Sequence, residues 1–316
     1  MVSELDKRHT QLDFMKLRGF WDPRVPSESP TSQSITDRAL PKTRKTQVPE
    51  TADPKASHKS SDLVKSFQPP AAPLLVKQGS PWDYYEKMYQ LRLGLDHRII
   101  VAEERYPPAE EFANVYSIRR FSDPDIISRQ HLFGDIRHPN FVSAKQIFLH
   151  DSQCYVVFEH MPCSLHEVRD NELLTELRLA AIVGQILNGL SYLAQRGLQH
   201  GSLSCSNIFL GYDGIVKIGE QEHCHQVPSR QAGRKDVRDL AAIVIDLISG
   251  DKKDDLFTFD RWSASHAIEF AEQSASAEST QDVSQHPLLR LAWEKVSLKG
   301  LANFGIAKAR RGCGRV

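Results

Sequence analysis

Two short polar stretches in the second half of the chain carry residue types that could do chemistry. The stretch "EHCHQ", residues 222–226, holds His223, Cys224 and His225, which are all types that bind zinc. Neighbouring side chains of an extended segment point to opposite faces, and no second ligand pair follows at zinc-finger spacing, so we expect an ordinary polar loop. The stretch "HGSLS", residues 200–204, lacks the G-x-S-x-G pattern of a nucleophile elbow, so Ser202 gains no hydrolase interpretation.

Regular elements are predicted to hold this second stretch in place. The apolar runs 207–210 and 215–218 flank "GYDG", and the Asp213-Gly214 pair is a strong signal for a tight turn between two strands. Upstream, residues 177–196 place apolar side chains at helical spacing, with Gly197 as a C-terminal cap. Downstream, residues 236–249 predict a helix enclosed on nearly all sides.

The part of the chain before residue 160 predicts a small sheet with one helix. Residues 82–93, "WDYYEKMYQLRL", have mixed spacing that we interpret as a short helix. The β-branched runs 98–106 and 114–121 predict an antiparallel pair of strands. A helical stretch follows over 123–136, and "LHDSQ" then separates two further strands.

The two ends of the chain have a different composition. Residues 22–80 are rich in Pro, Ser, Thr, Lys and Gln and bury too little apolar area to offset ordering entropy, so residues 1–80 are predicted to be a disordered arm. The arm contains "PKTRKTQVPE" and "SFQPPAAPLLV", which are candidates for docking or nuclear-import motifs beside the plainer interpretation as linker. Residues 305–316 are predicted to be a basic tail.

Charge and cysteine content exclude several classes of protein. The formal net charge is zero, with 40 basic and 40 acidic residues, so neither nucleic acid nor membrane is an expected partner. The five cysteines form no CxxC pair, the first twenty residues lack an apolar signal core, and no apolar run reaches the ~18 residues of a membrane helix. We therefore expect a reducing compartment, cytoplasmic or nuclear.

The order of these elements resembles the protein-kinase fold over roughly residues 85–300. "RHPNFV" looks like the segment after the regulatory helix of a kinase, "YVVFEHMPCSLHEV" like the hinge between lobes, and "QHPLLR" like a stretch near the kinase C-terminus. The resemblance implies an α+β, bilobal, protein-kinase-like fold, with a small β-rich lobe over 81–161 and a helical lobe over 162–304.

The same resemblance marks positions where kinase chemistry would lie. The H-R-D-L-x-x-x-N loop matches His200, Ser202 and Asn207, so a hydroxyl replaces the proton-accepting Asp, and Ser204 replaces the loop Lys. D-F-G matches Glu220 to Glu222, which implies a weakened magnesium site at Asn207 and Glu220. No catalytic residue is expected, while His200 and Asp236 keep structural roles.

In the small lobe the resemblance puts Arg119 at the phosphate-binding Lys and Arg129 at its Glu partner on the regulatory helix. Two like charges ~4 Å apart repel by roughly 4 kcal/mol near a surface, so we expect the helix to swing out or an acidic group to lie between them. If nucleotide binds at all, the residues implied to hold it are Arg119, Ser117, Phe158, Glu159, Met161 and Phe209. Gly94 alone stands where a glycine-rich loop would be.

Three functions remain open from the sequence. The first is a pseudokinase that requires no cofactor and binds other proteins, such as a kinase or a signalling complex. The second is an atypical kinase that uses ATP and Mg²⁺ for weak phosphotransfer. The third is an adaptor that acts through the arm, residues 22–80.

Overall fold

The computed structural model describes residues 74–95, 97–107, 114–122, 125–169, 171–228, 230–250 and 261–312. The chain divides between Ser66 and Phe67 into two units, and every described residue belongs to the second. The predictions for the arm through residue 73, including both of its candidate motifs, and for the last four residues of the tail lie outside the described residues.

Within the described residues, six strands form one sheet in the order β1-β5-β6-β4-β3-β2. The strands are β1 (Leu75–Gln78), β2 (Tyr85–Leu93), β3 (His97–Glu104), β4 (Val115–Phe121), β5 (Ala144–His150) and β6 (Gln153–Glu159). The predicted antiparallel pairing of β3 with β4 is confirmed. The two strands predicted on either side of "LHDSQ" are confirmed as β5 and β6, which pair with each other in antiparallel fashion. The predicted helical stretch is also confirmed, as α2 (Asp125–Arg129) and α3 (His131–Asp135).

The prediction of a helix over residues 82–93 is wrong. A short 3-10 turn, η2 (Pro81–Asp83), leads into β2, which pairs with β3 in antiparallel fashion. Tyr85, Leu91 and Leu93 are buried, whereas residues 86–90 are exposed. The irregular burial reflects a bulge between Lys87 and Tyr89, and pairing with β3 decides the conformation that the mixed spacing left ambiguous.

The predicted end of the arm at residue 80 is also wrong. Residues 75–78 form β1, which adds to the edge of the sheet and pairs with β5 in parallel. Leu75 and Val76 are largely exposed, so little apolar burial marks this strand in the sequence. Its order comes instead from backbone hydrogen bonds to β5, which composition cannot reveal.

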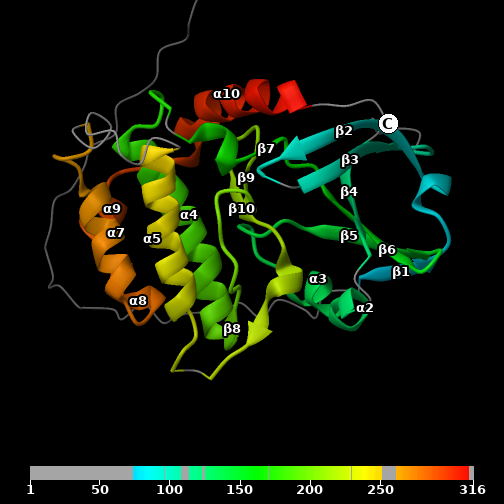
Figure 1. The fold of residues 1–316 in the computed structure, drawn as a ribbon, viewed down its shortest axis with the longest axis horizontal. Helices are drawn as coiled ribbons and strands as arrows, with labels where there is room; N and C mark the ends of the chain where they lie inside the picture. The colour runs from blue at the N-terminus through cyan, green and yellow to red at the C-terminus, as the bar shows by residue number, and fades with distance from the viewer. Residues whose placement is uncertain are drawn as a thin grey trace, which may run out of the picture. The chain divides into compact units, whose positions relative to one another are not determined.

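The helical lobe is built around α4 (Glu176–Gln195) and α5 (Arg234–Ser249), as predicted. Thr175 caps the start of α4, and Gly197 follows its end with a φ of 68°. Figure 1 shows α4 and α5 side by side, next to α7 (His266–Ser276), α8 (Thr280–Val283) and α9 (Pro287–Arg290), with the sheet opposite. The expected bilobal arrangement is therefore present.

Short elements connect the lobes. The hairpin predicted around "GYDG" is confirmed as β9 (Ile208–Leu210) and β10 (Val216–Ile218), and β9 also pairs with β7 (Cys163–Ser164). The remaining short elements are η3 (Leu165–Val168), β8 (Leu198–Gln199), η4 (Gln221–His223), β11 (His225–Gln226) and η5 (Lys295–Leu298).

The predicted basic tail over 305–316 is wrong up to residue 312. Helix α10 runs over Lys299–Ala309, and a 3-10 turn, η6 (Arg310–Gly312), continues it. Ile306 and Ala309 are buried, so packing orders a segment whose cations suggested a solvated tail. In Figure 1, α10 lies along the loops that carry β7 and β9 and ends toward β2.

Helix α4 also contradicts the expectation that no apolar run reaches the ~18 residues of a membrane helix. By length and composition this helix qualifies, but 67% of its most apolar window is buried inside the protein. Its position is that of a core helix, which passes the same compositional test.

Candidate functional site

Asp236 anchors the loop over residues 200–207, which carries the predicted catalytic positions. This side chain lies in the first turn of α5 and is fully buried, and its carboxylate oxygens accept hydrogen bonds from the backbone amides of His200 and Gly201, both at 2.9 Å. Burial raises the pKa of Asp236. We call these contacts the Asp236 brace, because they hold the loop through its backbone.

His200 ties the same loop to the strand above it. Its Nε2 lies 2.8 Å from the carbonyl oxygen of Gly219, so the proton is assigned to Nε2. The ring is fully buried, and burial lowers the pKa of His200. Its Nδ1 has no hydrogen-bond partner among the described residues. Both contacts of this residue are structural.

The hydroxyl groups of Ser202 and Ser204 make no contribution to the polar contacts described for this loop. Both residues are exposed, and neither hydroxyl makes a hydrogen bond within the described part of the chain. Their backbones instead bind Asn207, whose Nδ2 donates to the Ser202 carbonyl at 2.7 Å and whose Oδ1 accepts from the Ser204 amide at 2.9 Å. The side chain of Asn207 thus holds the backbone of the loop at Ser202 and Ser204.

Arg119 on β4 holds two carboxylates that follow β10. Its guanidinium lies 3.4 Å from Oε1 of Glu220 and 3.2 Å from Oε1 of Glu222, and these side chains are only 20%, 10% and 5% exposed, respectively. Asn207 Nδ2 donates to the other oxygen of Glu220 at 2.9 Å. We call Arg119, Glu220 and Glu222 the Arg119 cluster.

The predicted clash between Arg119 and Arg129 is resolved by an acidic group. Arg129, at the end of α2, donates to the backbone carbonyl of Glu222 at 3.2 Å, while the carboxylate of Glu222 binds Arg119. The turn η4 therefore lies between the two guanidinium groups. Of the two expected outcomes, the structure shows an acidic residue in contact with both arginines.

Glu220 adopts a backbone conformation that a non-glycine residue rarely takes. Its φ is 60° and its ψ is 42°, in the left-handed region. Such a residue costs of order 1–3 kcal/mol and persists when its surroundings fix it. Here the contacts with Arg119 and Asn207 provide that fixation.

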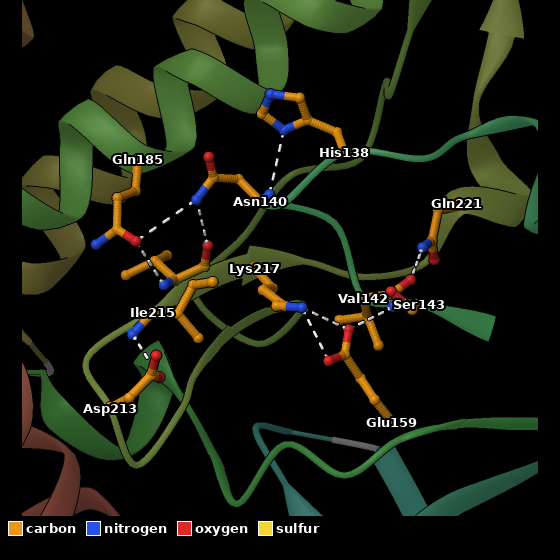
Figure 2. A network of polar contacts seen from close by, with 11 residues as sticks. His138, Asn140, Val142, Ser143, Glu159, Gln185, Asp213, Ile215, Lys217 and Gln221 are labelled. Atoms are coloured by element: carbon orange, nitrogen blue, oxygen red, sulfur yellow. Dashed lines mark hydrogen bonds and ion pairs between the residues drawn. The ribbon is translucent and has the colours of Figure 1, made fainter. Parts of the chain in front are cut away.

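The next residue, Gln221, is completely buried and carries an amide where an aromatic ring was implied. Its Nε2 donates to the carbonyl oxygen of Val142, as Figure 2 shows, whereas its Oε1 has no partner among the described residues. Close by, Lys217 binds both oxygens of Glu159 at 2.7 and 2.8 Å, and the Ser143 amide donates to Glu159 at 2.6 Å. Polar contacts join the lobes at this point.

The residues predicted to hold a nucleotide do converge on one cavity. Its lining includes Ser117, Arg119, Phe158, Glu159, Met161, Phe209 and Glu220. The free volume is about 30 Å³, which has room for one or two waters. Pockets that bind organic ligands usually measure roughly 300–1,000 Å³. The cavity is therefore much smaller than the pockets that usually hold organic ligands.

Two further contacts close this cavity. Ser117 Oγ lies 3.0 Å from Nδ1 of His160, which bridges β4 and the segment after β6. At the other end, the amide of Gly94 donates to Oε1 of Glu167 at 2.9 Å. A Cβ atom on Gly94 would lie only 2.5 Å from Cβ of Ser206, so the turn after β2 packs directly on the loop below.

Comparisons with known proteins support the architecture. Residues 113–263 match the family model "Protein kinase domain". Serine/threonine-protein kinase ste20 of Emericella nidulans is 26% identical over 226 residues, which cover 67% of this chain and 25% of the relative. Serine/threonine-protein kinase pakA of Talaromyces marneffei is 25% identical over 207 residues, or 64% and 32% of the two chains. The matched region is about a quarter to a third of these relatives.

The chain is a member of the protein kinase-like superfamily. Serine/threonine-protein kinase PAK mbt of Drosophila melanogaster is also similar, at 23% identity over 167 residues that cover 52% of this chain and 26% of the relative. The small sheet and helical lobe described above are thus those of a kinase-like fold.

Within this kinase-like fold, the predicted magnesium ligands do not fit a metal ion as they are arranged. The Oδ1 of Asn207 accepts from a backbone amide, and both oxygens of Glu220 face donors, one of which is a guanidinium. His223 does gather with Glu220 and Glu222, all within 4.8 Å, but the guanidinium of Arg119 already pairs with both carboxylates. Cys224 is buried and His225 is exposed on β11, so the "EHCHQ" trio does not converge.

Sequence reasoning missed three members of the site. Glu222 was placed only as part of the D-F-G match, and His160 and Lys217 were not singled out. Glu222 carried a signal, because the expected acidic group between Arg119 and Arg129 had to come from some nearby element. His160 is 43 residues from Ser117 and Lys217 is 58 from Glu159, so their pairing follows only from the fold.

Proposed function

We propose that this kinase-like chain is a pseudokinase, which transfers no phosphate and acts by binding other proteins. The observation that carries the proposal is the closed cleft. Where a kinase holds its nucleotide, about 30 Å³ remains, and Arg119 is engaged by Glu220 and Glu222. A nucleotide would have to break these buried ion pairs and also open the cavity.

The chemistry of the loop supports the same proposal. Ser202 stands at the proton acceptor, and a hydroxyl does not act as a general base near neutral pH. General base catalysis is typically worth ~10² to 10⁴-fold in rate. Because catalytic groups act as a unit, altering the base together with Ser204 and the Arg119 position leaves negligible phosphotransfer.

A second candidate is an atypical kinase that uses ATP and Mg²⁺, as kinases in general do. One contact favours it. Asn207 and Glu220, at the two metal-binding positions of the fold, touch each other at 2.9 Å. If Arg119 released Glu220 and the Asn207 amide rotated, the two side chains could face one ion.

The partners that suit a pseudokinase are other proteins, such as an active kinase or a signalling complex, in the cytoplasm or the nucleus. A zero net charge gives no reason to propose nucleic acid or a membrane instead. The adaptor hypothesis, in which the arm alone binds partners, remains a competing proposal.

Nucleotide binding by the full chain tests the proposal. We expect no change in melting temperature when ATP and Mg²⁺ are added, and no radiolabel transfer to protein substrates. A magnesium-dependent rise in melting temperature that Arg119→Ala and Glu220→Ala both abolish would revive the atypical kinase. Transfer that Asn207→Ala abolishes would end the pseudokinase proposal outright.

The adaptor hypothesis calls for a different comparison. A chain in which the order of residues 22–73 is shuffled keeps the composition of the arm but disrupts both of its candidate motifs. We expect partners identified with the natural chain to be retained by the shuffled chain. Loss of every partner would assign the binding to the arm instead.

A further inference from the structure

A second hollow, larger than the closed cleft, lies outside the hinge between the lobes. It is lined by Tyr89, Leu91, His160, Pro162, Tyr212, Ile306 and Arg310 and has a volume of about 410 Å³. We call it the hinge groove. Its residues come from β2, the segment after β6, the turn between β9 and β10, α10 and η6. The groove exists because α10 and η6 pack toward β2, where the sequence predicted a solvated tail.

The side chains of the hinge groove have the composition of a protein interface. Leu91 and Ile306 form an apolar floor and are 4% and 7% exposed, whereas the residues Tyr89 and Tyr212 are 36% and 57% exposed. Tyrosine and arginine are the types most enriched at the energetic centres of interfaces, since they bury large areas and keep a polar tip. Tyr212 sits on a tight turn, where no core contact requires an aromatic ring.

The charge of the groove has one sign. Arg310 is the charged side chain in the lining, Arg311 follows it, and no carboxylate lines the groove. Neither arginine forms an ion pair or a side-chain hydrogen bond within the described part of the chain. Burial lowers the pKa of His160 to about 4, so this ring is neutral at physiological pH.

The helix dipole of α10 explains the position of Arg310 but not the other features of the hinge groove. A cation there is favoured by the negative end of the helix dipole. That effect does not account for two exposed tyrosines and an apolar floor opposite the cation. A ligand with both apolar and anionic groups accounts for all three features.

We propose that the hinge groove binds an extended segment of a partner protein in which aromatic and acidic residues alternate or adjoin. The apolar side chains of the segment pack between Tyr89 and Tyr212, and its carboxylates pair with Arg310 and Arg311. This inference rests on the proposed function, because it names the surface through which the pseudokinase binds proteins. The cations at the groove are Arg310 and Arg311, and the chain as a whole has zero net charge. So small a positive surface favours a peptide over a nucleic acid.

A fluorescent random copolymer of glutamate and tyrosine provides a probe with this chemistry. Its binding to the full chain, without ATP, is measured by fluorescence anisotropy at low and moderate salt. We expect Arg310→Glu and Tyr212→Ser each to weaken binding by about tenfold or more, as for residues at an interface centre. Polyglutamate of the same length should bind more weakly than the copolymer, because it lacks the rings.

The matched control is Arg290→Glu, which makes the same charge change at an exposed position on α9. We expect this variant to bind the copolymer like the natural chain. Equal weakening by Arg290→Glu and Arg310→Glu would indicate general charge attraction and overturn the proposal. Unchanged binding in both groove variants, with their melting temperatures intact, would overturn it as well.

Two other occupants have their own outcomes. A chain that lacks residues 313–316 and binds the copolymer about tenfold tighter would identify its own tail as the occupant, and Tyr212-dependent dimers in sedimentation would identify a second copy. Either result replaces the partner segment. If the chain bound the copolymer through the hinge groove and also bound ATP, the result would support the groove proposal and count against the pseudokinase proposal. The two proposals can therefore fail separately.

Discussion

Two buried polar networks of the site, the Asp236 brace and the Arg119 cluster, are built from different kinds of contact. The Asp236 brace joins a side chain to the backbone amides of His200 and Gly201. The Arg119 cluster joins side chains to side chains, with an arginine and two glutamates at positions where the resemblance to kinases implies chemistry. The brace is what the resemblance to kinases implies, whereas the cluster is a substitute arrangement.

The difference between the networks follows from what each one holds. A contact with backbone amides fixes the course of the chain, so its loss disturbs the fold whatever the side chains do. A contact among side chains needs only balanced charge and satisfied hydrogen bonds, so it tolerates exchange of its members. The architecture is kept by the first kind of contact, and the chemistry can change through the second.

The strongest test of this comparison is Asp236→Ala. Two buried amides, those of His200 and Gly201, lose their acceptor, and each unsatisfied buried donor costs about 1–3 kcal/mol. We therefore expect the free energy of unfolding to fall by about 3 kcal/mol, as measured by urea denaturation. Asp239→Ala, at a partly exposed position of the same helix, is the control; it loses only the i,i+4 ion pair with Lys235 and should cost about 0.5 kcal/mol. Similar losses in both variants would remove the special role of the brace.

A smaller loss is expected from Arg119→Met. The substitution removes the guanidinium that pairs with Glu220 and Glu222. Breaking a fully buried pair costs about 3–5 kcal/mol, and we expect a smaller loss of about 2 kcal/mol because the Arg119 side chain is 20% exposed and water can reach the carboxylates. The matched control is Arg120→Met on the same strand, where the side chain is exposed and the charge change is identical. If Arg120→Met destabilised the protein as much, net charge and not the cluster would explain the effect.

The smallest effect concerns pH and His160, whose ring closes the cleft against Ser117. Its folded pKa of about 4 lies below the ordinary value of 6.5, so the unfolded chain binds more protons between these values. This contribution to stability is complete above pH 6.5 and is lost as the pH falls toward 4. We expect His160→Gln to flatten the fall in melting temperature over that range.

Other buried histidines keep part of this slope in the variant, because burial also lowers the pKa of His138, His166, His200 and His286. His131→Gln, at an exposed position on α3, is the control and should leave the profile unchanged. An unchanged profile in His160→Gln would mean that this ring is protonated without cost and that the cleft is open at its hinge end.

Much of the fold could be predicted from local pattern. Helices α4 and α5 were found because one long apolar face, or a nearly continuous apolar run with a capping glycine, admits few other structures. The turn at Asp213-Gly214 was found because its residue types match a particular backbone conformation. The kinase-like order of elements then placed Arg119, Asn207 and Glu220 around one site.

What the tertiary structure decided was which segments pair or pack with one another. Strand β2 was mistaken for a helix because its identity depends on β3, and α10 was mistaken for a tail because its burial depends on β7 and η3. The choice of Glu222 to separate Arg119 from Arg129, and the bond that joins Ser117 to His160, depend on how the lobes close. Residue types and spacing determine which groups the chain carries, but only packing across the chain determines which of them meet, because contact energies depend on distance in space.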